Sequence, residues 1–141
     1  MTMSKRILIT GGAGFIGSNF VHHWCENHEG RVVVLDILGY AGNEANVSDL
    51  ASQDRFRLVK GDICDAPLVA KLLEAEKIDT VVHFAAESHV DRSILGPAAF
   101  VQTNVVGTFT LLDAFRNRWN SEGQPSAYRF LHVSTDEGYG S

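Results

Sequence analysis

The sequence has few cysteines and no excess of positive charge, and each shortage excludes kinds of protein. Cys25 lies in an apolar, helix-like segment and Cys64 follows a short strand, and the pair predicts neither a disulfide framework nor a CxxC metal site; we expect buried free thiols. The 12 Lys and Arg residues are outnumbered by 17 Asp and Glu residues, which gives a net charge of −5. Without a basic cluster to attract phosphates, we expect no nucleic-acid partner.

Long hydrophobic runs are absent as well. At the amino terminus, the apolar stretch from Ile7 to Ile9 ends at polar Thr10. This stretch is too short for a signal sequence or a membrane span, so we expect a cytoplasmic protein with no membrane partner. The six histidines contain no H-E-x-x-H pattern, and His22 and His23 lie on different helix faces, so no metal site is predicted.

The 141 residues fit a single domain built around one core. Short runs rich in β-branched and aromatic residues predict strands at 6–10, 31–36, 56–60, 80–84 and 129–134. These runs are apolar almost throughout, so we expect every strand to be buried on both faces. Helical spacing of apolar residues predicts helices over 14–27, 67–77 and 97–119.

Alternating strands and helices predict an α/β fold with a doubly wound parallel sheet of the Rossmann type, in the strand order 3-2-1-4-5. In such sheets ligands bind at the carboxyl ends of the strands. The helix over 97–119 is apolar on more than one face. Either a neighbour from its own chain or a second subunit would cover the additional face.

A glycine-rich turn follows the first predicted strand. Residues 10–17 read TGGAGFIG and contain Gly12, Gly14 and Gly17 in the G-x-G-x-x-G pattern, at the start of a helix. One glycine permits a tight turn, one allows a pyrophosphate to approach the backbone, and one allows close packing of helix and strand. Amides at the start of the helix then hold the anion. The pattern predicts a dinucleotide site.

An acidic residue, Asp36, ends the second predicted strand, at the distance from the glycines that dinucleotide sites show. Its carboxylate can accept both hydroxyls of the adenosine ribose and would repel a 2′-phosphate. No arginine occurs in the next four residues, Ile37 to Tyr40. The sequence therefore favours NAD over NADP as cofactor.

Polar residues follow three further strands. Asp62 and Ile63 stand where an adenine ring would lie, although a simple turn is an equal alternative. Residues 84–88, FAAES, combine small residues with a hydroxyl, which suits a nicotinamide, while a tight strand exit without a ligand is the alternative. Residues 134–137, STDE, place two adjacent carboxylates on a loop, and these are either catalytic acids or merely solvated.

These stretches carry a resemblance to the extended short-chain dehydrogenases/reductases, the NAD-dependent epimerase/dehydratase family. The patterns TGGAGFIG and NVVGT, residues 104–108, are shared across that superfamily. YAGN at 40–43, AAESHVDRSI at 85–94 and STDE at 134–137 resemble the dTDP-glucose 4,6-dehydratases in particular. The likeness extends over nearly the whole chain, as the amino-terminal part of such an enzyme.

The resemblance implies a lyase of deoxysugar biosynthesis. NAD would take a hydride from C4 of dTDP-glucose, water would leave across C5 and C6, and the hydride would return to C6. By similarity, Glu137 is the base at C5, Asp136 is the acid, and Thr135 bonds near O4, while Ser88, Glu87 and Thr135 contact the nucleotide-sugar substrate. The cofactor contacts implied are Gly11, Gly14, Phe15, Ile16, Gly17, Asp36, Ile37, Leu38, Gly39, Asp62, Ile63, Phe84, Ala85, Ala86, Ser88 and Thr103.

The sequence departs from the family pattern at three points. The catalytic Tyr-x-x-x-Lys is not present, because Tyr139 would need a lysine two positions beyond the last residue. Gly39 replaces an expected threonine, and Gly138 replaces an expected valine after the acid pair. We therefore expect 1–141 to be an NAD-binding domain that lacks the later strands and the substrate domain and is inactive alone.

A homodimer is expected, because the complete protein would cover the helix over 97–119 with a second subunit.

Other functions remain open. A related 4-epimerase or decarboxylase is less favoured, because neither chemistry needs the adjacent acids Asp136 and Glu137. A non-catalytic NAD-binding module is the other alternative.

Overall fold

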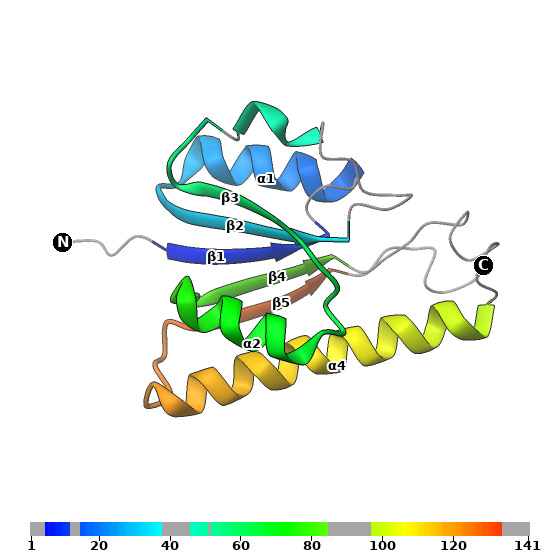
Figure 1. Cartoon of the computed structure of the whole chain (residues 1–141). Coiled ribbons are helices and arrows are strands. Elements are labelled where there is room, and N and C mark those ends of the chain that lie inside the picture. Colours follow the sequence, from blue (N-terminus) through cyan, green and yellow to red (C-terminus); the bar gives the residue numbers. More distant parts are fainter. Residues whose placement is uncertain (1–4, 12–14, 38–45, 51, 85–96, 134–141) are drawn as a thin grey trace.

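The computed structural model describes residues 5–11, 15–37, 46–50, 52–84 and 97–133, with the backbone alone for 15 and 97–104. Five parallel strands form one sheet in the order β3-β2-β1-β4-β5 (Figure 1). Along the chain the elements are β1 Lys5–Thr10, α1 Phe15–Asn27, β2 Gly30–Asp36, η2 Ser48–Leu50, β3 Phe56–Lys60, α2 Ala66–Ala75, β4 Thr80–Phe84, α4 Pro97–Ser121 and β5 Arg129–Val133. The predicted Rossmann-like fold and strand order are confirmed.

The burial of the strands follows their place in the sheet. In β1, β2 and β4, the three central strands, most residues are buried, as predicted, and the half-buried ones lie at the strand ends. The edge strands β3 and β5 are mostly half-buried or exposed, so the prediction that all five strands are buried is wrong for these two. An edge strand has a neighbour on one side only, and apolar content alone does not reveal that position.

Helices cover both faces of the sheet (Figure 1). On one face, α1 and the short η2 pack on a core that includes Ile7, Ile9 and Val34 of the strands, Val21 of α1 and Leu50 of η2. On the other face, α2 and α4 pack on a second core built around alternate residues of the same strands. The short 3-10 helix η2 was not predicted from the sequence.

Local signals explain where α2 begins. The Asp65 carboxylate accepts a hydrogen bond from the amide of Leu68 at 3.2 Å, which caps the helix, and Pro67 occupies its first turn. The helix thus starts at Ala66, one residue before the predicted start, and ends at Ala75. Its C-cap residue, Glu76, is 7% exposed.

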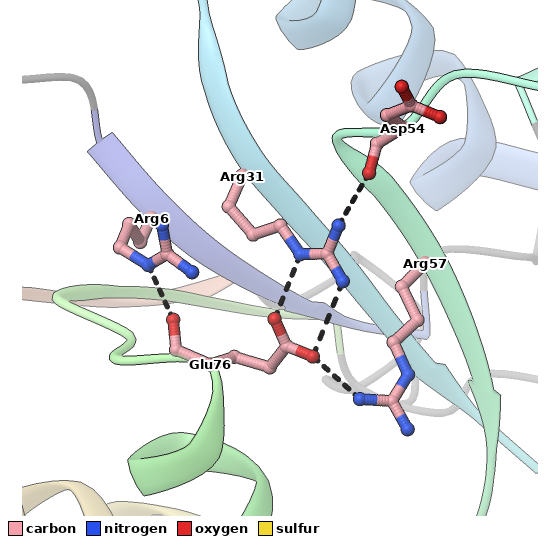
Figure 2. A network of polar contacts seen from close by, with 5 residues as sticks. All are labelled: Arg6, Arg31, Asp54, Arg57 and Glu76. Carbon is pink, nitrogen blue, oxygen red and sulfur yellow. Dashed lines mark hydrogen bonds and ion pairs between the residues drawn. The ribbon is translucent and has the colours of Figure 1, made fainter.

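A cluster of charges at the amino ends of the strands holds α2 in place. Arg6, Arg31 and Arg57 are each the second residue of their strands, β1, β2 and β3 (Figure 2). The Glu76 carboxylate accepts hydrogen bonds from Arg31 Nε at 2.8 Å and from Arg57 Nη1 at 2.6 Å. The Glu76 backbone carbonyl accepts from Arg6 Nε at 2.6 Å. We call these four residues the Glu76 cluster.

Close packing joins α4 to the chain after β3. A Cβ placed on Gly107 would lie 2.5 Å from Cδ1 of Ile63 and 3.4 Å from Sγ of Cys64, so only glycine fits against these side chains without rearrangement. Cys25 is buried as predicted, whereas Cys64 is half-buried; neither is in a disulfide. In the described part of the chain, we find no helix with the length and apolar character required to cross a bilayer.

Candidate functional site

The carboxyl ends of neighbouring strands meet at one edge of the sheet, the carboxyl edge. The register pairs Thr10 with Leu35 and with His83, and it pairs Phe84 with Val133. The carboxyl ends of these strands therefore lie side by side, at the end of the sheet opposite the Glu76 cluster. This is the edge at which the sequence predicts a ligand.

Gly11 makes the first turn after β1 possible. Its φ is +72°, a conformation that side chains disfavour, and its amide donates to the Leu35 carbonyl at 3.0 Å. A Cβ at this position would lie 2.9 Å from the carbonyl oxygen of Phe84 in β4. The chain at Gly11 thus packs against the end of β4 as closely as a glycine allows.

Gly17 and Ile16 lie in the first turn of α1, and Gly17 is buried, whereas Ile16 is 44% exposed. Burial of Gly17 agrees with its predicted role in close packing of the helix. The helix begins at Phe15, one residue after the predicted start. Gly12 and Gly14 lie outside the described residues.

Asp36 ends β2 as predicted and is 8% exposed. The amide of Gly61 donates to its backbone carbonyl at 3.0 Å, which ties together the chain after β2 and the chain after β3. In register, Asp36 is paired with Lys60, an exposed residue. The sheet therefore brings a basic residue beside Asp36 that a search along the following sequence does not find.

Asp62 and Ile63 form a turn after β3. Asp62 Oδ1 accepts from the Cys64 amide at 2.9 Å, and the Asp62 carbonyl accepts from the Asp65 amide at 3.0 Å. Burial and the Asp62 carboxylate raise the pKa of the Cys64 thiol. Ile63 packs against the second core and Gly107. Residues 62–65 therefore form a turn, and a cofactor role for Asp62 or Ile63 stays a prediction.

A buried polar contact at the carboxyl edge was missed by the sequence analysis. His83 in β4 is 1% exposed, and Nδ1 of its ring lies 2.5 Å from Thr10 Oγ1, while Nε2 lies 2.9 Å from Thr108 Oγ1 in α4. The ring of His132 in β5 stacks on it, with centroids 4.9 Å apart. Burial first, and the neighbouring His132 second, lower the pKa of His83 to about 4. The sequence feature that could have indicated this contact is a histidine within an otherwise apolar strand.

Several predicted site residues lie outside the described residues: Leu38, Gly39, Ala85, Ala86, Glu87, Ser88, Thr135, Asp136 and Glu137. Ile37 follows β2 and is 58% exposed, and Phe84 ends β4 half-buried. Thr103 lies on α4, one turn before Gly107. Within the described residues, no group of three or more metal-binding side chains is gathered at one point.

The carboxyl edge fits a dinucleotide on two observations. Gly11 turns the chain tightly at the end of β1, and a carboxylate ends the adjacent strand β2. In dinucleotide-binding sheets a tight glycine turn after the first strand leads into the phosphate site, and a carboxylate at the end of the second strand accepts ribose hydroxyls. The described geometry thus suits the cofactor that the sequence predicts.

Comparison with known proteins identifies the family. The family model described as GDP-mannose 4,6 dehydratase matches residues 8–141. The chain belongs to this family. It is 50% identical over 137 residues to dTDP-glucose 4,6-dehydratase 1 of Escherichia coli K12, across 96% of this chain and 38% of that protein. The chain therefore spans about two fifths of such relatives, corresponding to their amino-terminal part.

Solved structures of family relatives agree in fold. The dTDP-glucose 4,6-dehydratase of Bacillus anthracis in complex with NAD is 36% identical, with a TM-score of 0.79, and is matched over 98% of this chain and 40% of that one. A double mutant of DesIV, the dTDP-glucose 4,6-dehydratase of Streptomyces venezuelae, with NAD bound, is 47% identical, with a TM-score of 0.77, over 96% and 41%. The resemblance inferred from the sequence motifs is confirmed.

Proposed function

We propose that the chain is the cofactor-binding part of a cytoplasmic dTDP-glucose 4,6-dehydratase, a lyase that forms dTDP-4-dehydro-6-deoxyglucose and water. The observation that carries the proposal is the carboxyl edge, where Gly11 follows β1 and Asp36 ends the adjacent strand β2. The chain that forms this edge is 50% identical to such an enzyme. When bound, NAD supplies an acceptor for the hydride from C4 and a donor that returns it to C6.

Asp36 favours NAD over NADP. Its carboxylate accepts ribose hydroxyls and repels a 2′-phosphate. Lys60, its partner in register, is exposed, so water and salt screen its charge, whereas Asp36 is buried. The buried acid therefore dominates the choice between the two cofactors.

The acid pair provides the elimination chemistry. A ketone at C4 acidifies the C5 hydrogen; Glu137 accepts that proton, the C5–C6 double bond forms, and the C6 hydroxyl leaves as water with a proton from Asp136. Thr135 donates a hydrogen bond near O4. Support comes from β5, because Val133 is paired with Phe84 and the chain beyond it starts at the carboxyl edge.

Association with a second copy through α4 is also part of the proposal. Four large apolar side chains on this helix are exposed by 43–67%: Val105, Val106, Phe109 and Leu112. A row of this size on one helix is typical of an interface. Sedimentation of the protein at rising concentration distinguishes a dimer from a monomer.

Calorimetric titration tests the cofactor assignment. We expect the chain to bind NAD more tightly than NADP. Asp36→Ala should weaken NAD binding and reduce the difference in affinity between the two cofactors. Asp54→Ala is the matched control, because it removes the same charge from an exposed position at the opposite edge of the sheet. Equal affinity for both cofactors, or unchanged NAD binding in Asp36→Ala, refutes the assignment.

A further inference from the structure

A buried imidazole joins three segments of the chain at the carboxyl edge. His83 of β4 contacts the Thr10 hydroxyl at the end of β1 and the Thr108 hydroxyl in α4, at 2.5 and 2.9 Å. Thr10 and His83 are 1% exposed each, and His132 of β5 stacks on the imidazole. Four elements therefore meet at one ring.

Each contact lies next to a segment that the proposed function assigns to the ligand. Thr10 directly precedes Gly11, whose turn approaches the carbonyl of Phe84. His83 directly precedes Phe84, where the chain leaves β4. Thr108 follows Gly107, the residue at which α4 packs on Ile63. A shift of the ring would therefore move all three segments relative to one another.

The hydrogen-bonding pattern is specific to this set of groups. A neutral imidazole has one nitrogen that donates and one that accepts, so one threonine must accept while the other donates. Burial keeps the ring neutral, since it lowers the pKa of His83 to about 4. Serine can replace either threonine in this pattern, whereas valine has the shape of threonine but no hydroxyl.

Packing alone does not account for the cluster. The two preceding strand residues, Val81 and Val82, are buried and apolar, and an apolar residue at position 83 would fill the same core without needing two polar partners. A polar group that is fully satisfied in a core restricts the geometry of what surrounds it. The restriction here falls on the carboxyl edge.

We propose that His83 is a positioning residue: through the Thr10 and Thr108 hydroxyls it holds the Gly11 turn and the exit of β4 in the arrangement that binds the dinucleotide. The inference rests on the proposed binding of NAD. His83 is too deeply buried to contact the cofactor itself, and it acts through the backbone that follows Thr10 and the backbone that follows its own residue.

The test compares removal of the two hydroxyls that contact His83 with removal of a hydroxyl at the amino end of β4. Thr10→Val and Thr108→Val are expected to weaken NAD binding about tenfold, which corresponds to the loss of one well-placed contact. Thr10→Ser and Thr108→Ser restore the hydroxyl and should bind within about threefold of the wild type. Thr80→Val is the matched control. It removes a buried β4 hydroxyl that donates a hydrogen bond to Asp79, at the edge of the sheet where the strands begin. This variant should lower the melting temperature but leave NAD affinity unchanged.

A second readout does not depend on binding. In ¹⁵N NMR spectra of the His83 ring, the wild type should show one protonated and one unprotonated nitrogen in a single tautomer, and Thr108→Val should yield a mixture of tautomers. Thr108 lies in a helix and is half-buried, so its variant is available if Thr10→Val does not fold.

The outcomes separate the two proposals. A wild type that binds no NAD overturns the proposed function and this inference with it. A wild type that binds NAD, with valine variants that bind equally well, overturns the inference alone. An equal loss of affinity in Thr80→Val overturns it too, because general destabilisation then explains the effect.

Discussion

Acidification should destabilise the protein through His83. Its pKa lies near 4 in the folded chain, against an ordinary value of 6.5, because burial disfavours the charged ring. The unfolded chain therefore binds a proton at a pH where the folded chain does not. The stability that depends on the neutral ring is present in full above pH 6.5 and is lost as the pH falls toward 4.

The size of the effect follows from the two pKa values. Each unit of difference is worth about 1.4 kcal/mol, so the total is about 3 kcal/mol, of which about 2 kcal/mol is lost between about pH 7 and about pH 5. Stopping there avoids most of the loss from Glu76, whose pKa is lowered from 4.5 by its hydrogen bond to Arg31, and whose contribution disappears at still lower pH.

Urea unfolding of the wild type and of His83→Gln measures the effect. Glutamine offers a donor and an acceptor but does not titrate in this range. His22 acts in the opposite sense: its pKa is raised by the Asp49 hydrogen bond, so its contribution is present below pH 6.5 and is lost as the pH rises through the raised pKa. That term is common to both proteins and cancels in the difference. Parallel pH profiles for the two proteins would refute the reasoning.

Two further predictions concern stability. Glu76→Gln removes the charge that two arginines contact, and it should lower the free energy of unfolding by about 2 kcal/mol at neutral pH, a value discounted because Arg57 is half exposed. Urea unfolding checks this, and a loss that does not shrink as the pH falls progressively below 4.5 would contradict it. Gly107→Ala gains up to about 1 kcal/mol of helix propensity but places a Cβ 2.5 Å from Ile63, and overpacking costs about 1–3 kcal/mol. A lower melting temperature is therefore expected, and a higher one would show that Ile63 moves aside freely.

The strands and their order could be predicted because they depend on local patterns and on general rules of topology. Short β-branched runs between amphipathic segments admit few arrangements, and right-handed crossovers reduce these further. The exposure of β3 and β5 depends instead on which strands end up at the edges. The short helix η2 is anchored by the buried side chains of Val47 and Leu50, which stand among polar residues in the sequence. Two apolar residues in a polar stretch are too weak a pattern to detect.

The candidate site divides in the same way. Gly11 and Asp36 could be found, because each is part of a linear motif with a fixed spacing. The contacts of His83 join residues 73 and 25 positions apart, and those of Glu76 reach across 45 and 19 positions. No periodicity within a segment reports such pairs. Lys60 beside Asp36 is a third case, since it follows from the register of two strands.

The two polar clusters lie at opposite ends of the same strands and differ in chemistry. At the amino edge, where the strands begin, the Glu76 cluster joins a buried carboxylate to arginines that reach solvent. The stabilisation that this cluster provides therefore depends on salt and pH, and the cluster lies away from the proposed ligand site. At the carboxyl edge a neutral imidazole and two hydroxyls carry no charge. These uncharged groups therefore add no charge to the electrostatic field that Asp36 creates around an anionic cofactor. Stability can therefore be adjusted at one edge with little electrostatic effect on the binding edge.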